Sequence, residues 1–132
     1  MLAATPPIVP FAVQQAIARR APRVAYVPAR IATGYRYRAW SVGGGVVRIR
    51  FANRAGKELV FVASPRTTPC ANGKEKTFQM SGNRVYWGHT SEEQEAWRCV
   101  DGVQLTAATS QPPTAFADVG LGTVAASAHR IR

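Results

Sequence analysis

The stretch GYRYRAWSVGGGVVRIRFANRAGKELVFV, residues 34–62, decides the fold that the sequence predicts. Polar and apolar residues alternate on both sides of the glycine run at 43–45, and the NRAG segment at 53–56 separates them from a further apolar stretch. Such alternation is typical of half-buried β-strands, because successive side chains of a strand point to opposite faces of the sheet. Glycine in both short segments suits tight turns. The stretch therefore predicts consecutive antiparallel strands.

The same alternation predicts which face each side chain takes. A loop formed by residues 43–45 would gather apolar and small residues on one face, in the pairs Tyr37–Phe51, Ala39–Ile49 and Ser41–Val47. The opposite face would be basic and would carry Arg36, Arg38, Trp40, Arg48 and Arg50. Pairing across NRAG would set Leu59 opposite Phe51 and Phe61 opposite Ile49, with Val60 and Val62 on the basic face. A slip by one residue would mix arginine with isoleucine, so the pattern selects this register.

The second half of the chain predicts further hairpins. Strands are expected at KTFQM (76–80), RVYWGH (84–89), QEAWRCV (94–100) and VQLTAAT (103–109). With TSEE (90–93) as the loop of one hairpin, Tyr86 faces Trp97, and aromatic pairs across strands stabilise sheets. Asp101-Gly102 is among the strongest signals for a two-residue hairpin turn.

The end of the chain changes to a helical period. Residues 111–130 predict a helix that begins at Pro113–Thr114 and ends at His129–Arg130. Its apolar side would consist of Phe116, Val119, Leu121 and Val124. Gly120 and Gly122 each weaken a helix by about 1 kcal/mol relative to alanine. We therefore expect this helix to depend on packing against the sheet, where small residues permit close approach.

Together these elements predict an α+β domain. Its antiparallel meander sheet would have six to seven strands, with a C-terminal helix packed on one face. We expect this single domain to span residues 34–132. Residues 1–33 are rich in proline and alanine and predict a leader or linker, in which only FAVQQAIARR (11–20) could form a short helix.

The chain is strongly basic for its size. Its 132 residues include 17 Lys and Arg against 7 Asp and Glu, a formal net charge of +10. A basic surface attracts nucleic acid, anionic lipid head groups or acidic wall polymers, and charge alone does not choose among them. No run approaches the roughly 18 consecutive apolar residues of a membrane span, so no transmembrane segment is predicted.

Two cysteines, Cys70 and Cys99, lie far apart in the sequence and form no CxxC motif. They predict one structural disulfide and, with it, an oxidising extracytoplasmic location. Closing a loop of that length stabilises a fold by about 3.5 kcal/mol in the chain-entropy model. The alternative is a pair of buried free thiols in a cytosolic protein. The first 20 residues lack the basic start and uninterrupted apolar core of a signal peptide, which the extracytoplasmic prediction would lead one to expect.

The stretch with the most varied chemistry, SGNRVYWGHTSEEQEAWRCV (81–100), carries His89 beside Glu92 and Glu93. A histidine next to carboxylates can act as a general base or supply half of a metal site. One histidine and loop glutamates are too few ligands for zinc, and no nucleophile has a placed partner. We therefore predict no catalytic residue and no metal, with a hydrolase centred on His89 as an alternative. The VGGGV segment (42–46) enters no helix and lacks the P-loop lysine, so no cofactor is predicted.

The basic face carries the main functional expectation. Arginines that contact phosphates, beside an aromatic ring that stacks on bases, are how sheets bind single-stranded nucleic acid. The candidate polyanion-binding residues are Arg36, Arg38, Trp40, Arg48 and Arg50. In the alternative interpretation, the arginine stems cover Trp40, Val60 and Val62 and only keep this face in water.

Two segments resemble a known family. VYWGHTSEEQEAWRCVDGVQLTAATSQPPTAFADVGLGTVAAS (85–127) and YVPARIATGYRYRAWSV (26–42), with Gly34-Tyr35 at a matching place, are similar to domains of unknown function in bacterial, notably actinobacterial, proteins. These domains occur in extracytoplasmic parts of anti-sigma factors, in lipoproteins and in secreted proteins. The resemblance covers about residues 26–128. It implies an extracytoplasmic α+β domain without established catalysis.

The leading hypothesis from the sequence is a non-enzymatic extracytoplasmic module for interaction or structure. Its partner would be an unidentified protein or a component of the cell envelope. The alternative is binding of a polyanion, such as single-stranded nucleic acid or an acidic polymer, through the basic face.

Overall fold

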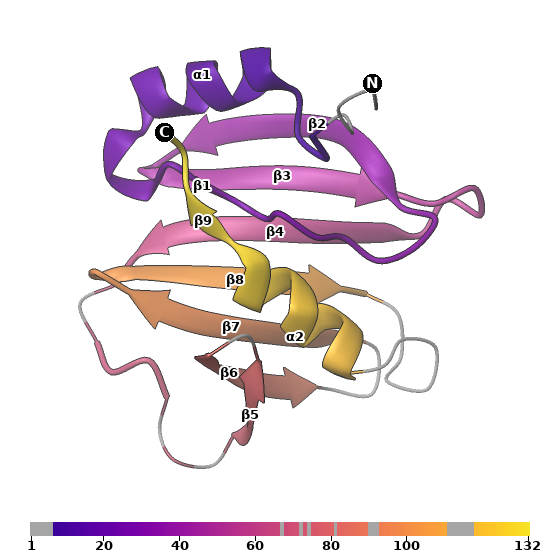
Figure 1. Cartoon of the computed structure of the whole chain (residues 1–132), viewed down its shortest axis with the longest axis vertical. Coiled ribbons are helices and arrows are strands. Elements are labelled where there is room, and N and C mark those ends of the chain that lie inside the picture. Colours follow the sequence, from indigo (N-terminus) through magenta and orange to yellow (C-terminus); the bar gives the residue numbers. More distant parts are fainter. Residues whose placement is uncertain are drawn as a thin grey trace, which may run out of the picture.

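The computed structural model describes residues 7–66, 68–71, 73, 75–80, 82–89, 93–110 and 118–132. In chain order, the elements are α1 (Phe11–Arg20), the 3-10 turn η1 (Pro22–Val24), β1 (Tyr26–Val27), β2 (Arg36–Gly43), β3 (Val46–Ala52), β4 (Glu58–Pro65), β5 (Lys76–Met80), β6 (Asn83–His89), β7 (Gln94–Val100), β8 (Val103–Thr109), α2 (Asp118–Ser127) and β9 (His129–Arg130). The predicted α+β fold is confirmed, with an antiparallel sheet and α2 packed on it (Figure 1).

The main sheet of the described chain has seven antiparallel strands in the order β2-β3-β4-β8-β7-β6-β5. It consists of two meanders, β2 to β4 and β5 to β8, whose last strands pair with each other. At this junction Phe61 lies opposite Ala107 and Ala63 lies opposite Leu105, and all of these side chains are buried. The sequence predicted the hairpins within each meander, but it did not predict which strands would join them.

The predicted pairing of β3 with β4 is confirmed. Phe51 faces Leu59 and Ile49 faces Phe61, and these side chains are fully buried. The turn between the strands is also as predicted, because Gly56 takes a left-handed φ of +80°. The second hairpin signal is confirmed at the β7–β8 turn, where Asp101 and Gly102 have φ values of 50° and 76°. Two adjacent residues with positive φ are what a type I′ hairpin turn requires.

The predicted register of β2 against β3 is wrong over part of its length. The turn uses Gly44 and Gly45, with φ of +59° and +74°, so that Gly43 pairs with Val46. This two-residue turn matches the right-handed twist of the strands better than the expected loop. As a result Trp40 faces Ile49, while Ala39 and Ser41 face Arg50 and Arg48.

A β-bulge then corrects the register further along β2. The pairing shifts between Tyr37 and Ala39, which restores the expected pair of Tyr37 with Phe51. A bulge sets two residues of one strand opposite one residue of the partner. Arg38 and Ala39 therefore share the face of Arg50. The bulge thus keeps Arg36 and Arg38 on the same face as the arginines of β3.

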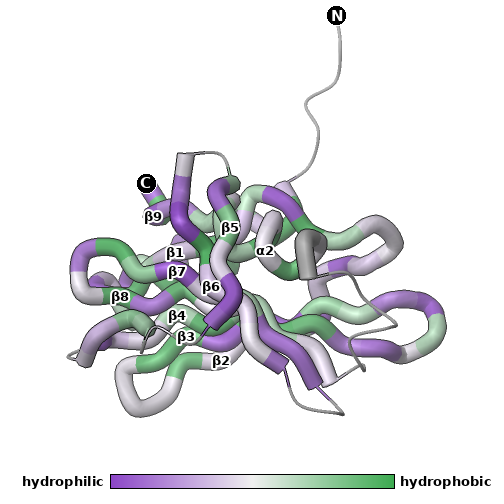
Figure 2. Tube along the Cα trace, turned by 90° about the horizontal axis from the view of Figure 1, so that it is seen from below, coloured by the Kyte–Doolittle hydropathy of each residue, from purple (hydrophilic) through white to green (hydrophobic). Residues whose placement is uncertain are grey.

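The segment before β2 packs into the domain, whereas the sequence predicted a leader or linker for residues 1–33. The short helix expected at 11–20 is confirmed as α1. Val9, Ile17 and Val24 are buried in the common core, and β1 pairs with β9. Figure 2 shows β1, β9 and α2 on the same side of strands β2, β3 and β4. We call the sheet face beneath these elements the inner face.

Helix α2 covers the inner face of β6, β7 and β8. Leu121 and Val124 are buried as predicted, and Gly122 permits close approach, since a Cβ there would lie 2.8 Å from the Sδ atom of Met80. The predicted start at Pro113–Thr114 and the predicted contacts of Phe116 and Val119 lie outside the described residues and side chains. The predicted end is wrong, because α2 ends at Ser127 and His129–Arg130 form β9.

Ser127, the last residue of α2, links the helix to the segment before β2 by hydrogen bonds. Its hydroxyl donates to the carbonyl of Val124 at 2.8 Å and accepts from the amides of Ala29 and Arg30 at 3.1 and 3.0 Å. None of the helices in the described ranges is long and apolar enough to span a membrane.

Candidate anion-binding face

The face of the sheet opposite α1 and α2, which we call the outer face, has two unlike halves. Cross-strand pairing defines one row of side chains across it: Ser41, Arg48, Val62, Thr106, Trp97 and Tyr86. The next row is Ala39, Arg50, Val60, Ala108 and Glu95. The outer face is therefore basic over β2 and β3 and aromatic or polar over β6 and β7.

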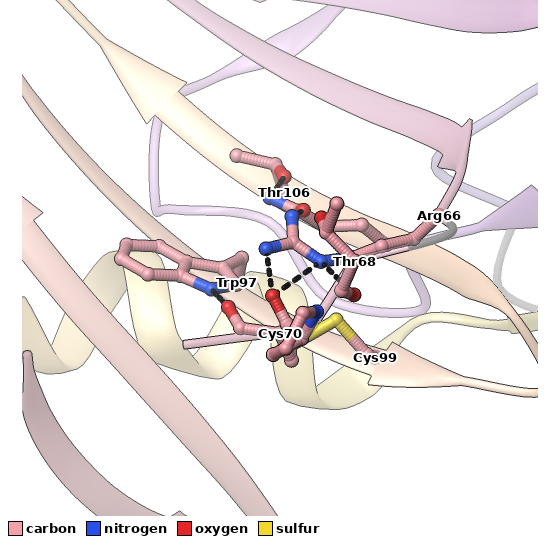
Figure 3. The surroundings of a disulfide bond; sticks show 8 residues. Arg66, Thr68, Cys70, Trp97, Cys99 and Thr106 are labelled. Carbon is pink, nitrogen blue, oxygen red and sulfur yellow. Dashed lines mark hydrogen bonds between the residues drawn. A yellow bond between two sulfur atoms is a disulfide. The ribbon is translucent and has the colours of Figure 1, made fainter. Parts of the chain in front are cut away.

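The aromatic half is covered by the connection between β4 and β5. This strap, the described residues among 66–75, is held by the Cys70–Cys99 disulfide, which has an S–S distance of 2.05 Å and confirms the predicted pairing. The indole Nε1 of Trp97 donates to the carbonyl of Cys70 at 2.8 Å. Figure 3 shows Trp97 and Arg66 reaching toward the strap backbone.

Arg66, the first residue of the strap, holds the strap backbone and ties it to β8. Its Nε donates to the carbonyls of Thr68 and Pro69, each at 3.0 Å, and its Nη1 donates to the side chain of Gln104. Trp97 also stacks on Tyr86 at a centroid distance of 5.9 Å. The strap and these contacts bury Trp97 to 8% exposure.

The basic half remains open to solvent. We define the arginine face as Arg36, Arg38, Arg48 and Arg50, all of which are exposed. Within the described chain, no hydrogen bond or ion pair occupies their side chains. The cross-strand neighbours of Arg48 and Arg50 are Ser41, Ala39, Val62 and Val60, none of which is acidic. The guanidinium groups are therefore available to an anion from solution.

Trp40 does not belong to this face, which corrects the prediction. Because the turn contains two residues rather than three, Trp40 points to the inner face opposite Ile49. There it is half-buried, and the guanidinium of Arg20 from α1 lies 5.3 Å from its ring centroid. The base-stacking residue expected beside the arginines is thus absent from the described outer face of β2.

His89 lies at the end of β6 beside a hollow of about 260 Å³. Glu93 and Glu95 line the same hollow, whereas Glu92 is outside the described residues. Burial raises the pKa of Glu95, and the nearby charge of Glu93 raises it further. The exposed imidazole of His89 packs on Trp87 with ring centroids 4.7 Å apart.

Besides His89 and the two glutamates, the described lining of this hollow consists of Gly88, Gln94 and Ala108. Its described lining holds no Ser, Thr or Cys that could act as a nucleophile, and His129 lies in β9 and does not line it. Among the residues with described positions, no group of three or more His, Cys, Asp or Glu side chains could hold a metal ion.

No protein-family model matches this sequence, and no curated protein is significantly similar to it. The resemblance to extracytoplasmic domains of unknown function therefore stays a prediction. What the fold and the site define is a class: an α+β domain with a disulfide-fastened strap over one half of its outer face and exposed arginines on the other half.

Proposed function

We propose that this domain is a non-enzymatic binding module of an extracytoplasmic compartment, and that its arginine face binds an anionic polymer. The observation that carries the proposal is the set of four exposed arginines on two neighbouring strands, with no acidic residue directly opposite them in the strand pairing. An arginine fork donates two parallel hydrogen bonds to a carboxylate or phosphate. Unpaired forks on one surface favour an anionic partner.

The arrangement suits a repeating charge better than a compact ligand. Arg48 and Arg50 are two residues apart on β3, which separates their positions by about 7 Å. Arg38 lies across from Arg50 at the bulge, so the positive charge continues from β3 onto β2. A polymer lying along this face could neutralise several arginines at once and release the counterions condensed on it.

The position of Trp40 argues for electrostatic binding without reading of bases. Stacking on aromatic rings contributes about 1–3 kcal/mol per base in proteins that bind single strands. With Trp40 on the inner face, the arginine face has no such ring among its described members. We therefore expect binding that depends strongly on salt and weakly on base sequence.

The extracytoplasmic location rests on the disulfide, since structural disulfides persist in oxidising compartments. A cell-envelope polymer is then the natural partner. Quantifying thiols in protein isolated under alkylating conditions tests the location. We expect no free thiol per chain, and two free thiols in native material would overturn it.

Binding is tested with a dye-labelled oligothymidylate as the probe anion, followed by fluorescence anisotropy. The variant Arg48→Gln/Arg50→Gln should lower the affinity by at least about tenfold, because charged hydrogen bonds contribute about 1.5–3 kcal/mol each. The matched control is Arg19→Gln/Arg23→Gln, which removes the same charge from exposed positions in α1 and η1. Equal losses in both variants would mean that the arginines only contribute net charge, and the proposal would fail.

A further inference from the structure

A hollow of about 620 Å³ lies where β2 begins and β3 ends. Three arginines line it, Arg36, Arg38 and Arg54, together with neighbouring residues of the start of β2, the end of β3 and the adjoining turns. Arg36 and Arg38 belong to the arginine face, and Arg54 is added by the turn that follows β3. The hollow therefore continues the arginine face into a concave site.

Two tight turns fix the rim of this hollow. In the turn after β3, the side-chain oxygen of Asn53 accepts from the amides of Ala55 and Lys57 at 3.0 and 2.9 Å. In the turn before β2, the amide of Tyr35 donates to the carbonyl of Ala32 at 3.1 Å, and Gly34 has a φ of +88°. Asparagine hydrogen bonds and a positive-φ glycine hold such turns in one conformation. The three arginines thus extend from ordered backbone.

The charge of the hollow is unbalanced. No acidic residue is among its described lining. Glu58 pairs with the lining residue Ala52 across β3 and β4, but its own side chain does not line the hollow. The arginines that line it come from two separate segments, the start of β2 and the turn after β3. Concave sites lined by one sign of charge also focus the field more strongly than a flat face.

The number of arginines at the hollow selects among anions. A carboxylate presents two oxygens and one negative charge, which a single arginine fork satisfies. A phosphate within a chain carries one charge as well. A terminal phosphate monoester presents three oxygens and carries a charge of about −1.5 to −2 near neutral pH. It matches three arginines better than the other two groups do.

We propose that this hollow binds a terminal phosphate monoester, with the rest of the phosphate polymer lying over Arg50 and Arg48. The inference rests on the proposed function for the polymer, and it adds that the polymer is built on phosphate and is held by its end. The shared chemistry is a phosphate dianion, whose source is either the end of a chain or free inorganic phosphate.

The test compares two oligothymidylates of equal length, with and without a 5′-phosphate, by anisotropy on the intact protein. We expect the 5′-phosphate to raise the affinity by about tenfold, the size of one charged hydrogen bond. Arg54→Gln should abolish this preference. Lys57→Gln should retain the preference, because this substitution removes one positive charge from the same turn, but Lys57 is not among the residues that line the hollow. Melting curves of both variants check that they remain folded.

Further measurements distinguish a chain end from free inorganic phosphate as the ligand, and they distinguish failure of this site from failure of the proposed function. The preference should fall below a pH of about 6, where the monoester loses its second charge. If millimolar inorganic phosphate removes the preference and oligothymidylate still binds, both proposals hold. The protein could instead bind inorganic phosphate in a way that Arg54→Gln abolishes, while neither oligonucleotide binds. This result would mean that the hollow is a site for free phosphate, and it would overturn both the proposed function and the assignment of a chain end as the ligand. Equal affinities for the two oligonucleotides, or a preference that Arg54→Gln leaves unchanged, would overturn the proposed phosphate site in the hollow. The proposed function of the arginine face would then still hold.

Discussion

Replacing Cys70 and Cys99 by alanine removes the covalent link between the strap and β7, and its cost follows from the loop that it closes. The cysteines are 29 residues apart in sequence. In the chain-entropy model, a cross-link over a loop of this length stabilises the fold by about 3.6 kcal/mol at 25 °C. Since small domains are stable by only about 5–15 kcal/mol in total, the loss would be large.

The assay is urea denaturation at neutral pH, followed by tryptophan fluorescence. Trp97 lies against the strap through its hydrogen bond to the Cys70 carbonyl, so its emission reports on this region. We expect the double variant to lose about 3 to 4 kcal/mol of unfolding free energy relative to the oxidised protein. Thr68→Ala, at an exposed position of the same strap, serves as the control and should change stability little, within about 0.5 kcal/mol.

A loss below about 1 kcal/mol would refute the reasoning, because it would mean that the disulfide does not restrict the unfolded chain. A matching loss in Thr68→Ala would assign the effect to strap contacts instead of to the cross-link. Reduction of the wild-type protein by a dithiol should reproduce the stability of the double variant.

Three further predictions concern stability. Glu95→Gln should raise the melting temperature at pH 7, because burial and the charge of Glu93 raise the pKa of Glu95, so that the ionised carboxylate destabilises the fold. The gain in melting temperature should shrink on acidification toward pH 4, and a gain independent of pH would contradict this explanation. Gly122→Ala should destabilise the protein by about 1–3 kcal/mol, because the new Cβ would lie 2.8 Å from the Sδ atom of Met80. In a Met80→Ala background the same substitution should stabilise the fold by about 1 kcal/mol through helix propensity. Urea denaturation of the wild type, the two single variants and the double variant tests this coupling, and additive effects would contradict it. Arg98→Met should lower the free energy of unfolding by about 2 kcal/mol, because the guanidinium donates to the carbonyls of Ala125 and Ala128 at and just beyond the end of α2. A change below about 0.5 kcal/mol in urea denaturation would show that these hydrogen bonds add no stability.

The sequence predicted those parts of the fold that follow from strict alternation or from turn chemistry. Ile49 and Phe51 alternate with arginines on β3, and pairing across the next turn sets Phe61 opposite Ile49, so one register buries all three, and the structure has it. The Asp101-Gly102 turn was equally predictable, because few residues tolerate positive φ at both positions.

The position of Trp40 could not be predicted in the same way. A run of three glycines permits either a two-residue or a three-residue turn, and the two choices place Trp40 on opposite faces. The bulge between Tyr37 and Ala39 conceals the difference, because it restores the expected pair of Tyr37 with Phe51. Alternation on β2 alone therefore supported a wrong register as well as the true one.

The packed segment before β2 and the basic hollow were missed for other reasons. Val9, Ile17 and Val24 come from three separate short pieces, none long enough to show a period. Arg54 joins Arg36 only because β2 and β3 pair antiparallel, which brings the turn after β3 back to the start of β2. An arginine within the predicted NRAG turn was the available signal.

The binding claim is tested most directly by the salt dependence of the association constant for a single-stranded phosphate polymer. Four arginine–phosphate contacts predict a slope of about −2.8 in a plot of log K against log salt, or about a 50-fold loss of affinity between 50 and 200 mM salt. Glutamine at Arg36, Arg38, Arg48 and Arg50 should bring the slope close to zero. Glutamine at the exposed Arg19, Arg23, Arg30 and Arg132 should leave it nearly unchanged. A slope that survives the first set of substitutions, or that is lost equally with the second, would contradict binding by the arginine face.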